Sequence, residues 1–228
     1  MLLGSPARAQ VAGHTYTPDA NAEYLNHVLA SGKGNPGGPP TGGSMLLPHW
    51  SRGQIVLTSG RVQRPWLKFD LAGQRLLWRR PAGDSLELDT KDIREFVLTD
   101  SLRGLSYTYR RYLSARIDKL ALRTVFYEVR YDAGGAALLR RRERVPQRGS
   151  SAPSLLGRQP GQWREITRFY LRRADNVMEP VELNPKVILA VLGPDHAPAL
   201  AAYVSRLQLR LTTEADVVKL LEYYDTLD

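Results

Sequence analysis

Residues 50–60 read Trp-Ser-Arg-Gly-Gln-Ile-Val-Leu-Thr-Ser-Gly, and they open the part of the sequence that decides the fold. Further short runs rich in β-forming residues follow at Val62–Leu71, Arg75–Arg80, Leu86–Leu88 and Ile93–Thr99. Gly, Asp and Pro separate these runs at close, regular intervals. That spacing is typical of an antiparallel meander, a small barrel or a sandwich.

Alternation within the runs indicates strands with one buried face. Between residues 66 and 71, Trp, Lys and Asp alternate with Leu, Phe and Leu. Since successive side chains of a strand point to opposite faces, the apolar set is expected inside and the polar set outside. The strongest single strand is predicted over Thr124–Tyr131, and the segment Asp132–Gly135 has the composition of a hairpin loop.

The C-terminal part has a helical pattern instead. Asn184 before Pro185 is a typical helix start, and Gly193 is a typical end. A second helix is predicted over residues 194–207, and a last helix begins with a capping-box-like segment at Thr213. We therefore predict an α+β protein, with an antiparallel β-rich body at 48–183 (a small barrel, sandwich or meander) and a C-terminal helical subdomain at 184–228 packed on it.

The N-terminal residues resemble a processed leader. Residues 7–9 read Ala-Arg-Ala, a signal-peptidase type of motif, so residues 1–10 are interpreted as the remnant of a signal peptide. Residues 11–47 are expected to form a flexible leader with a short helix over Asp19–Ala30, because a run dense in Gly and Pro follows. Export to the periplasm is the resulting prediction, and a cytoplasmic location is the alternative.

Composition narrows the chemistry. The chain has 228 residues, no cysteine and a net charge of +9, which rules out disulfides and thiolate metal sites. No apolar run approaches the roughly 18 residues that a transmembrane helix needs. Residues 101–150 hold twelve Lys or Arg against four Asp or Glu, so most of the excess positive charge lies there. A local basic surface of this kind attracts phosphates, acidic polymers or anionic lipid head groups.

Recognisable catalytic patterns are missing. None of the four histidines has another at helical metal-ligand spacing, and no serine-nucleophile motif occurs, so we expect no catalytic residue, metal or cofactor. One alternative remains: Glu87 and Asp89 would lie on one face of a strand about 7 Å apart, a separation that a glycoside hydrolase could use. The solvent-facing side of a strand is the simpler interpretation of that pair.

The basic residues are the better candidates for a binding site. Arg110 and Arg111 lie between two tyrosines, and arginine interleaved with tyrosine can stack on and ion-pair with an anionic ligand. The predicted anion-binding residues are Arg110, Arg111, Arg140, Arg141, Arg142 and Arg144. The expected partners are an anionic glycan, a lipid head group or an envelope protein. Nucleic acid is not expected for an exported chain, but a polyanion or nucleic-acid binder using residues 101–150 is an alternative.

Several spaced motifs carry a resemblance. The chain fits W-x-x-G-x-[IV]-x-L-x-x-G from Trp50, then [KR]-[YF]-[DN]-[LV] from Lys68, I-x-x-F-x-L-x-D from Ile93 and a helical ending over Glu214–Asp225. In this it resembles a loose group of uncharacterised exported β-rich proteins of Bacteroidota. The resemblance implies export and supplies neither an activity nor site residues. The expected function is that of a non-enzymatic exported binding or structural-interaction module at the cell envelope.

Overall fold

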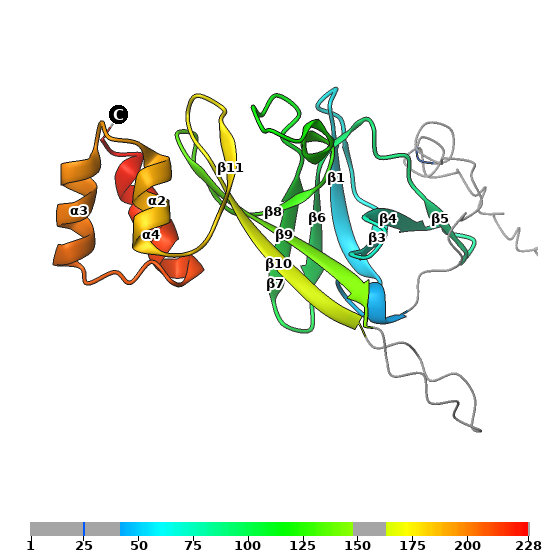
Figure 1. Ribbon diagram of the computed structural model, residues 1–228. Coiled ribbons are helices and arrows are strands. Elements are labelled where there is room, and N and C mark those ends of the chain that lie inside the picture. The colour runs from blue at the N-terminus through cyan, green and yellow to red at the C-terminus, as the bar shows by residue number, and fades with distance from the viewer. Residues whose placement is uncertain (1–24, 26–41, 148–162, 228) are drawn as a thin grey trace, which may run out of the picture.

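The computed structural model describes Leu25, residues 42–147 and residues 163–227 (Figure 1). Within those residues, eleven strands form one open antiparallel sheet in the order β11-β10-β9-β8-β7-β6-β1-β3-β4-β5, and β2 pairs with β1. The strands are β1 (Ser51–Leu57), β2 (Val62–Gln63), β3 (Trp66–Asp70), β4 (Arg75–Arg79), β5 (Ser85–Glu87), β6 (Ile93–Asp100), β7 (Leu105–Arg110), β8 (Tyr127–Asp132), β9 (Ala137–Pro146), β10 (Trp163–Arg172) and β11 (Met178–Val181).

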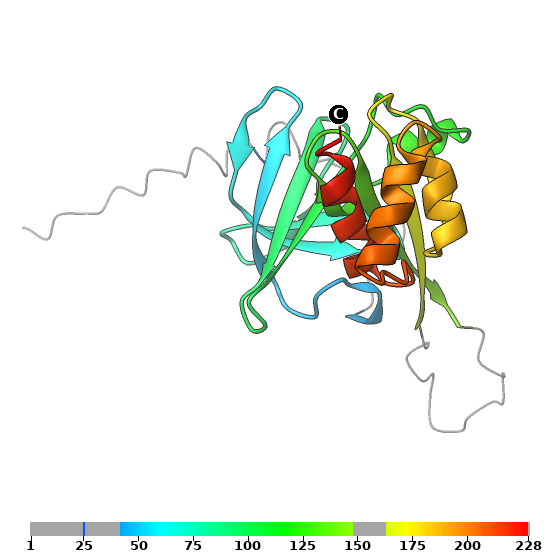
Figure 2. The same cartoon turned by 90° about the vertical axis from the view of Figure 1, so that its left-hand side faces the viewer.

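Three helices follow the sheet: α2 (Pro185–Leu192), α3 (Ala197–Arg206) and α4 (Glu214–Tyr224). They pack side by side at the end of the sheet formed by β8–β11, far from β3–β5 (Figures 1 and 2). Short 3-10 helices occupy Gly42–Ser44 and Leu120–Arg123. The predicted α+β class, with a β-rich body and a C-terminal helical part, is confirmed.

The sheet departs from a plain meander because β1 pairs with three strands. Its first residues pair with β3, with Arg52 opposite Trp66, whereas the residues from Gly53 onward pair with β6 and, near the end of β1, with β2. A Cβ atom at Gly53 would lie 2.6 Å from Leu67 Cδ1 and 2.9 Å from the Val97 carbonyl oxygen. Glycine is therefore required where β1 passes from one partner to the next and the sheet bends.

The described body begins before residue 48, where the sequence placed its boundary. Met45, Leu46 and Leu47 are buried, and the Leu46 amide donates to the carbonyl of Phe69 at 2.8 Å. These residues pair with the C-terminal end of β3, along the same edge of β3 that pairs with β1. The predicted signal remnant at 1–10 and the predicted helix over Asp19–Ala30 lie outside the described residues, except for the buried Leu25.

We call the sheet face that carries Phe69, Phe96 and Tyr109 the inner face. The sheet curls around these rings and Phe126, whose centroids lie 4.9 to 6.3 Å apart, and they form the centre of the first hydrophobic cluster. Such aromatic contacts stabilise a core beyond the area that they bury. The alternation predicted for residues 66–71 is confirmed for the apolar set, which is buried in this cluster. Asp70 was expected outside with the polar set, but it is buried because Arg75 pairs with its carboxylate at 2.8 Å.

A second cluster joins the helices to the inner face of β8–β11. Leu138 and Leu171 of the sheet pack with Leu200, Leu220 and Leu221 of the helices, and all five are fully buried. On the outer face of the same strands, a third cluster gathers the following residues: Tyr112, Ala115, Ile117, Tyr127, Ala137, Leu139, Tyr170 and Met178. Strands β8–β10 are thus covered on both faces.

Local capping signals explain where the helices begin. The Asn184 side chain accepts a hydrogen bond from the Val187 amide at 2.9 Å, and Thr213 accepts from the Asp216 amide at 3.2 Å, as the sequence predicted. At the other end of α4, the Asp225 carboxylate accepts hydrogen bonds from the Tyr131 hydroxyl at 2.7 Å and the Ala136 amide at 3.0 Å. The last helix is therefore fastened to the turn between β8 and β9.

Candidate functional site

The arginine run of β9 is split between two faces. Because side chains alternate along a strand, Arg140, Arg142 and Arg144 lie on the inner face and Arg141 lies on the outer face. Arg141 forms an ion pair there with Glu143. The predicted run is therefore not one continuous basic patch.

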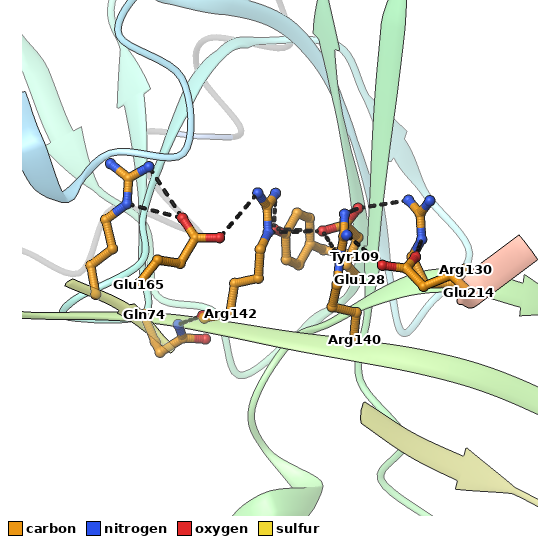
Figure 3. A network of polar contacts seen from close by, with 9 residues as sticks. Gln74, Tyr109, Glu128, Arg130, Arg140, Arg142, Glu165 and Glu214 are labelled. Carbon is orange, nitrogen blue, oxygen red and sulfur yellow. Dashed lines mark hydrogen bonds and ion pairs between the residues drawn. The ribbon is translucent and has the colours of Figure 1, made fainter. Parts of the chain in front are cut away.

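Glu128 is the centre of a network on the inner face (Figure 3). Its side chain is 1% exposed. Its carboxylate accepts hydrogen bonds from Arg140 Nη2 at 2.6 Å and Arg130 Nη1 at 2.9 Å, and it forms an ion pair with Arg142, whose Nε lies 3.1 Å away. The registers of β7, β8 and β9 place it opposite Tyr109 on one side and Arg140 on the other. A carboxylate taken out of water in this way is stabilised by its cations and hydrogen bonds.

Two further glutamates share the same arginines. Glu214, at the start of α4, pairs with Arg130 and accepts a hydrogen bond from Arg140 Nη1 at 2.7 Å. Glu165 of β10 lies 3.7 Å from Arg142 Nη1 and 3.3 Å from the nearest nitrogen of Arg144 (Figure 3). The network thus connects three strands with the last helix.

A tyrosine lies at the floor of the network. The Tyr109 hydroxyl donates to Glu128 at 3.4 Å and accepts from Arg142 Nη2 at 3.2 Å. Burial raises the pKa of Tyr109 well above its ordinary value, and the neighbouring Glu128 carboxylate acts in the same direction. The phenol is therefore neutral at physiological pH, and it contributes hydrogen bonds.

The C-terminal part of β9 contacts the beginning of the body and the end of β3. Arg144 Nη1 donates to the carbonyl oxygens of Gly43 and Met45 at 2.7 and 2.9 Å, and its amide donates to Leu71 at 3.4 Å. Gln74 donates through Nε2 to the Arg142 carbonyl at 3.2 Å. Arg144 therefore serves to hold β9 against the start of the body.

Arg110 and Arg111 do not join this network. Arg110 donates to Glu95 at 2.6 Å and to Asp132 at 2.7 Å on the outer face. Arg111 is 6% exposed, donates to the backbone carbonyls of Lys91 and Ile93, and lies 5.0 Å from the ring centre of Phe126. Burial lowers the pKa of Arg111. Each of the six predicted arginines thus already has acceptors within the chain, and anion binding by them stays a prediction.

The two carboxylates considered for hydrolysis are each paired with a different cation. Glu87 Oε2 lies 3.9 Å from Arg75 at the end of β5, whereas Asp89 lies 3.2 Å from Lys91 beyond that strand. Hydrogen bonding from the Lys91 amide lowers the pKa of Asp89. Both groups are therefore ion-paired carboxylates, with Glu87 the more buried of the two.

A groove of about 690 Å³ opens between β10, β11 and the segment before α4. Its lining residues are Thr167, Arg168, Phe169, Pro180, Val181, Glu182, Leu183 and Thr212. Arg168 is already paired with Glu143 at 2.6 Å. The groove has the size of a small-molecule site but carries no set of convergent polar groups.

A second basic surface lies on the outer face of β1, β3 and β4. We call it the aromatic-basic face, and it consists of Trp50, Arg52, Trp66, Lys68 and Arg79. The strand registers align Arg52, Trp66 and Arg79 in one row across the three strands. The Arg52 guanidinium lies 5.1 Å from the ring centre of Trp66, and Trp66 is 44% exposed. Such geometry is a cation–π interaction.

The second pair on this face has the same form. Lys68 Nζ lies 5.4 Å from the ring centre of Trp50 and donates to the Pro48 carbonyl at 2.8 Å, and partial burial lowers the pKa of Lys68. Neither Arg52 nor Arg79 forms an ion pair with any other residue in the described ranges. Sequence reasoning missed this face, although the alternation of Trp66 and Lys68 on the solvent side of β3 was a usable signal.

No family model, curated protein or solved structure matches this chain, so its function has to be inferred from its own residues. In the part of the chain that the structure describes, no group of three or more metal-ligating side chains is placed to hold a metal ion. Among the described helices, none has the length and apolar character that crossing a membrane requires.

Proposed function

We propose that this chain is a non-enzymatic binding module that acts at the cell envelope and binds a polyanion through the aromatic-basic face. One observation carries the proposal: Arg52 and Arg79 flank the exposed Trp66 in a single row, without a carboxylate partner among the described residues. Guanidinium groups that have no carboxylate partner in the described part of the chain, beside an exposed ring, suit an external anionic ligand. The inner-face arginines of β9, in contrast, are already paired with Glu128, Glu165 and Glu214.

The net charge of the chain also favours binding of a polyanion. A net charge of +9 produces a positive potential that raises the encounter rate with an extended anion, and local contacts then hold it. The alternative within this proposal is a polyanion site on residues 101–150, as the sequence indicated. The two versions differ in which arginines the ligand needs.

Removing the two row arginines should weaken retention on a heparin column. We expect the Arg52→Ala, Arg79→Ala double variant to elute at clearly lower salt than the wild type, because exposed ion pairs with a ligand are screened by salt. Arg206→Ala is the matched control, since this exposed arginine also lies over an aromatic ring, 5.3 Å from the ring centre of Tyr203. The single variants Arg206→Ala and Arg52→Ala each remove one positive charge, so their elution positions can be compared directly.

Equal elution of the Arg52→Ala and Arg206→Ala variants would contradict the assignment of the binding face. A shift seen only with Arg141→Ala would favour the arginine-rich region instead. Arg141 is suited to this comparison because it lies outside the Glu128 network. Thermal unfolding of each variant shows whether an altered elution reflects an altered fold.

Export is tested separately. We expect the native protein, isolated from its own organism, to occur in the envelope or periplasmic fraction and to lack residues 1–9, because the Ala-Arg-Ala motif precedes Gln10. Mass spectrometry of the intact native protein measures the N-terminus directly. A protein that retains Met1 and fractionates with the cytoplasm would contradict the location, but not polyanion binding itself.

A further inference from the structure

We infer that the aromatic-basic face binds an acidic polysaccharide, with a sugar ring packed on the part of Trp66 that stays exposed beside the Arg52 guanidinium and its acidic groups bonded to Arg52 and Arg79. This inference rests on the proposed function and specifies its ligand. The row that carries it runs across four strands, because Arg79 is paired in register with Ser85 of β5. It presents, in order, a cation, an indole, a second cation and a hydroxyl group.

The dimensions of the sheet set the spacing of these groups. Neighbouring strands lie about 4.8 Å apart, so each guanidinium starts from a strand next to that of the indole. Along β3, Lys68 lies about 7 Å beyond Trp66 and brings Trp50 with it as a second aromatic surface. The face therefore offers two rings and three cations within the span of a short oligosaccharide.

The chemistry of these side chains matches an acidic sugar. A pyranose ring has an apolar C–H face that packs flat on an indole, while the polar edge of the indole stays in water. Guanidinium groups are planar forks that bind a carboxylate or a sulfate through two parallel hydrogen bonds. The Ser85 hydroxyl at the end of the row can donate to or accept from a sugar hydroxyl.

A membrane surface fits this face less well. Insertion into a bilayer interface needs apolar side chains that project several ångströms into the acyl region. Trp66 lies beneath the Arg52 guanidinium, and Leu77, its neighbour on the same face of β4, is buried. The face therefore has no projecting apolar group beyond the partly covered indole.

A nucleic-acid strand fits less well because its charges are closer together. Each nucleotide adds a phosphate, so a single strand is held by a continuous track of cations and stacking rings. Here the track is short, since Lys68 is aligned across the strands with Leu77 and Glu87, and the following row pairs Asp70 with Arg75. Asp70 is buried and paired with Arg75 at 2.8 Å, and Glu87 lies 3.9 Å from the same arginine, so this cation is already matched within the chain. A polymer with hydroxyl groups between its charges matches that pattern better.

Binding of defined polymers to the full-length chain tests the inference. Polygalacturonate is the probe, and a neutral galactan, an oligothymidylate and vesicles containing phosphatidylglycerol are the comparisons, all measured by calorimetric titration. We expect polygalacturonate to bind most tightly. Trp66→Ala should weaken it by at least about tenfold, the equivalent of about 1.4 kcal/mol, whereas Trp66→Phe should retain most of the affinity because it keeps a flat ring.

The outcomes separate the inference from the proposed function. Tighter binding of oligothymidylate or vesicles than of polygalacturonate overturns the acidic polysaccharide, and the polyanion proposal stands. Binding of polygalacturonate that needs Arg52 and Arg79 but is unchanged by Trp66→Ala overturns the stacked sugar ring only. Absence of binding to every anionic probe overturns both. Arg206→Ala, which removes an equal charge elsewhere, should leave every affinity unchanged.

Discussion

Replacing Glu128 by alanine should lower the free energy of unfolding by about 3–5 kcal/mol, because it leaves cations without their buried partner. Three arginine side chains converge on this carboxylate, and Arg140 and Arg142 are themselves largely shielded from water. The loss also removes an acceptor of the buried Tyr109 hydroxyl. Urea unfolding followed by circular dichroism measures the change.

Glu179→Ala is the matched control for this substitution. Its carboxylate also faces an arginine, Arg173 at 3.6 Å, but the side chain is 45% exposed. Exposed pairs of this kind contribute about 0–1 kcal/mol, so the control should change little. Glu128→Gln, which keeps the shape and one acceptor oxygen, should fall between the two. A Glu128→Ala variant that is no less stable than Glu179→Ala would show that the network does not depend on this charge.

Alkaline solution should unfold the protein cooperatively once the pH rises above about 10, the ordinary pKa of tyrosine. Burial raises the pKa of Tyr109, Tyr112, Tyr127 and Tyr131 in the folded state, and Asp132 adds to the shift at Tyr112. The folded state therefore holds these protons more tightly than the unfolded state. Their stabilising contribution is complete below the unfolded pKa and is lost as the pH rises towards and through the folded pKa.

Ultraviolet absorbance of tyrosinate and far-ultraviolet circular dichroism, recorded along one pH titration, measure this effect. We expect much of the tyrosinate signal to appear together with the loss of secondary structure, because the buried phenols ionise only as the chain opens. Tyr112→Phe should make stability depend less steeply on pH, since it removes one shifted group. A tyrosinate signal that develops fully while the dichroism stays constant would contradict the explanation.

Much of the fold could be predicted because its signals are local. Alternation around Phe69 and the caps at Asn184 and Thr213 each depend on a few neighbouring residues, and the structure confirms them. Strand β7 was not predicted, since Leu105–Arg110 has only one fully buried side chain and lacks a clear apolar alternation. The early start of the body depends on contacts of Leu46 with β3, which no local pattern reveals.

The site was harder to predict because counting arginines along the sequence does not show which of them pair with carboxylates in the fold. Arg140 looked free in the sequence, yet it is paired with Glu128, twelve positions away, and with Glu214, 74 positions away. Conversely, Arg52, Trp66 and Arg79 belong to separate runs and become one row only through the registers of β1, β3 and β4. Among the described residues, the basic surface without carboxylate partners is therefore the one with the smaller local excess of arginine.

The way α4 is fastened also bears on how this architecture could change in evolution. Both ends of the helix depend on the hairpin of β8 and β9, through Glu214 at the start and Asp225 at the end. The helices also use Leu138 and Leu171 of the sheet as the floor of their cluster. Consequently, the helices could not be exchanged between proteins as a separate unit that begins at Asn184, where the strands end. A piece that could be transplanted whole would have to include β8–β11 together with the three helices.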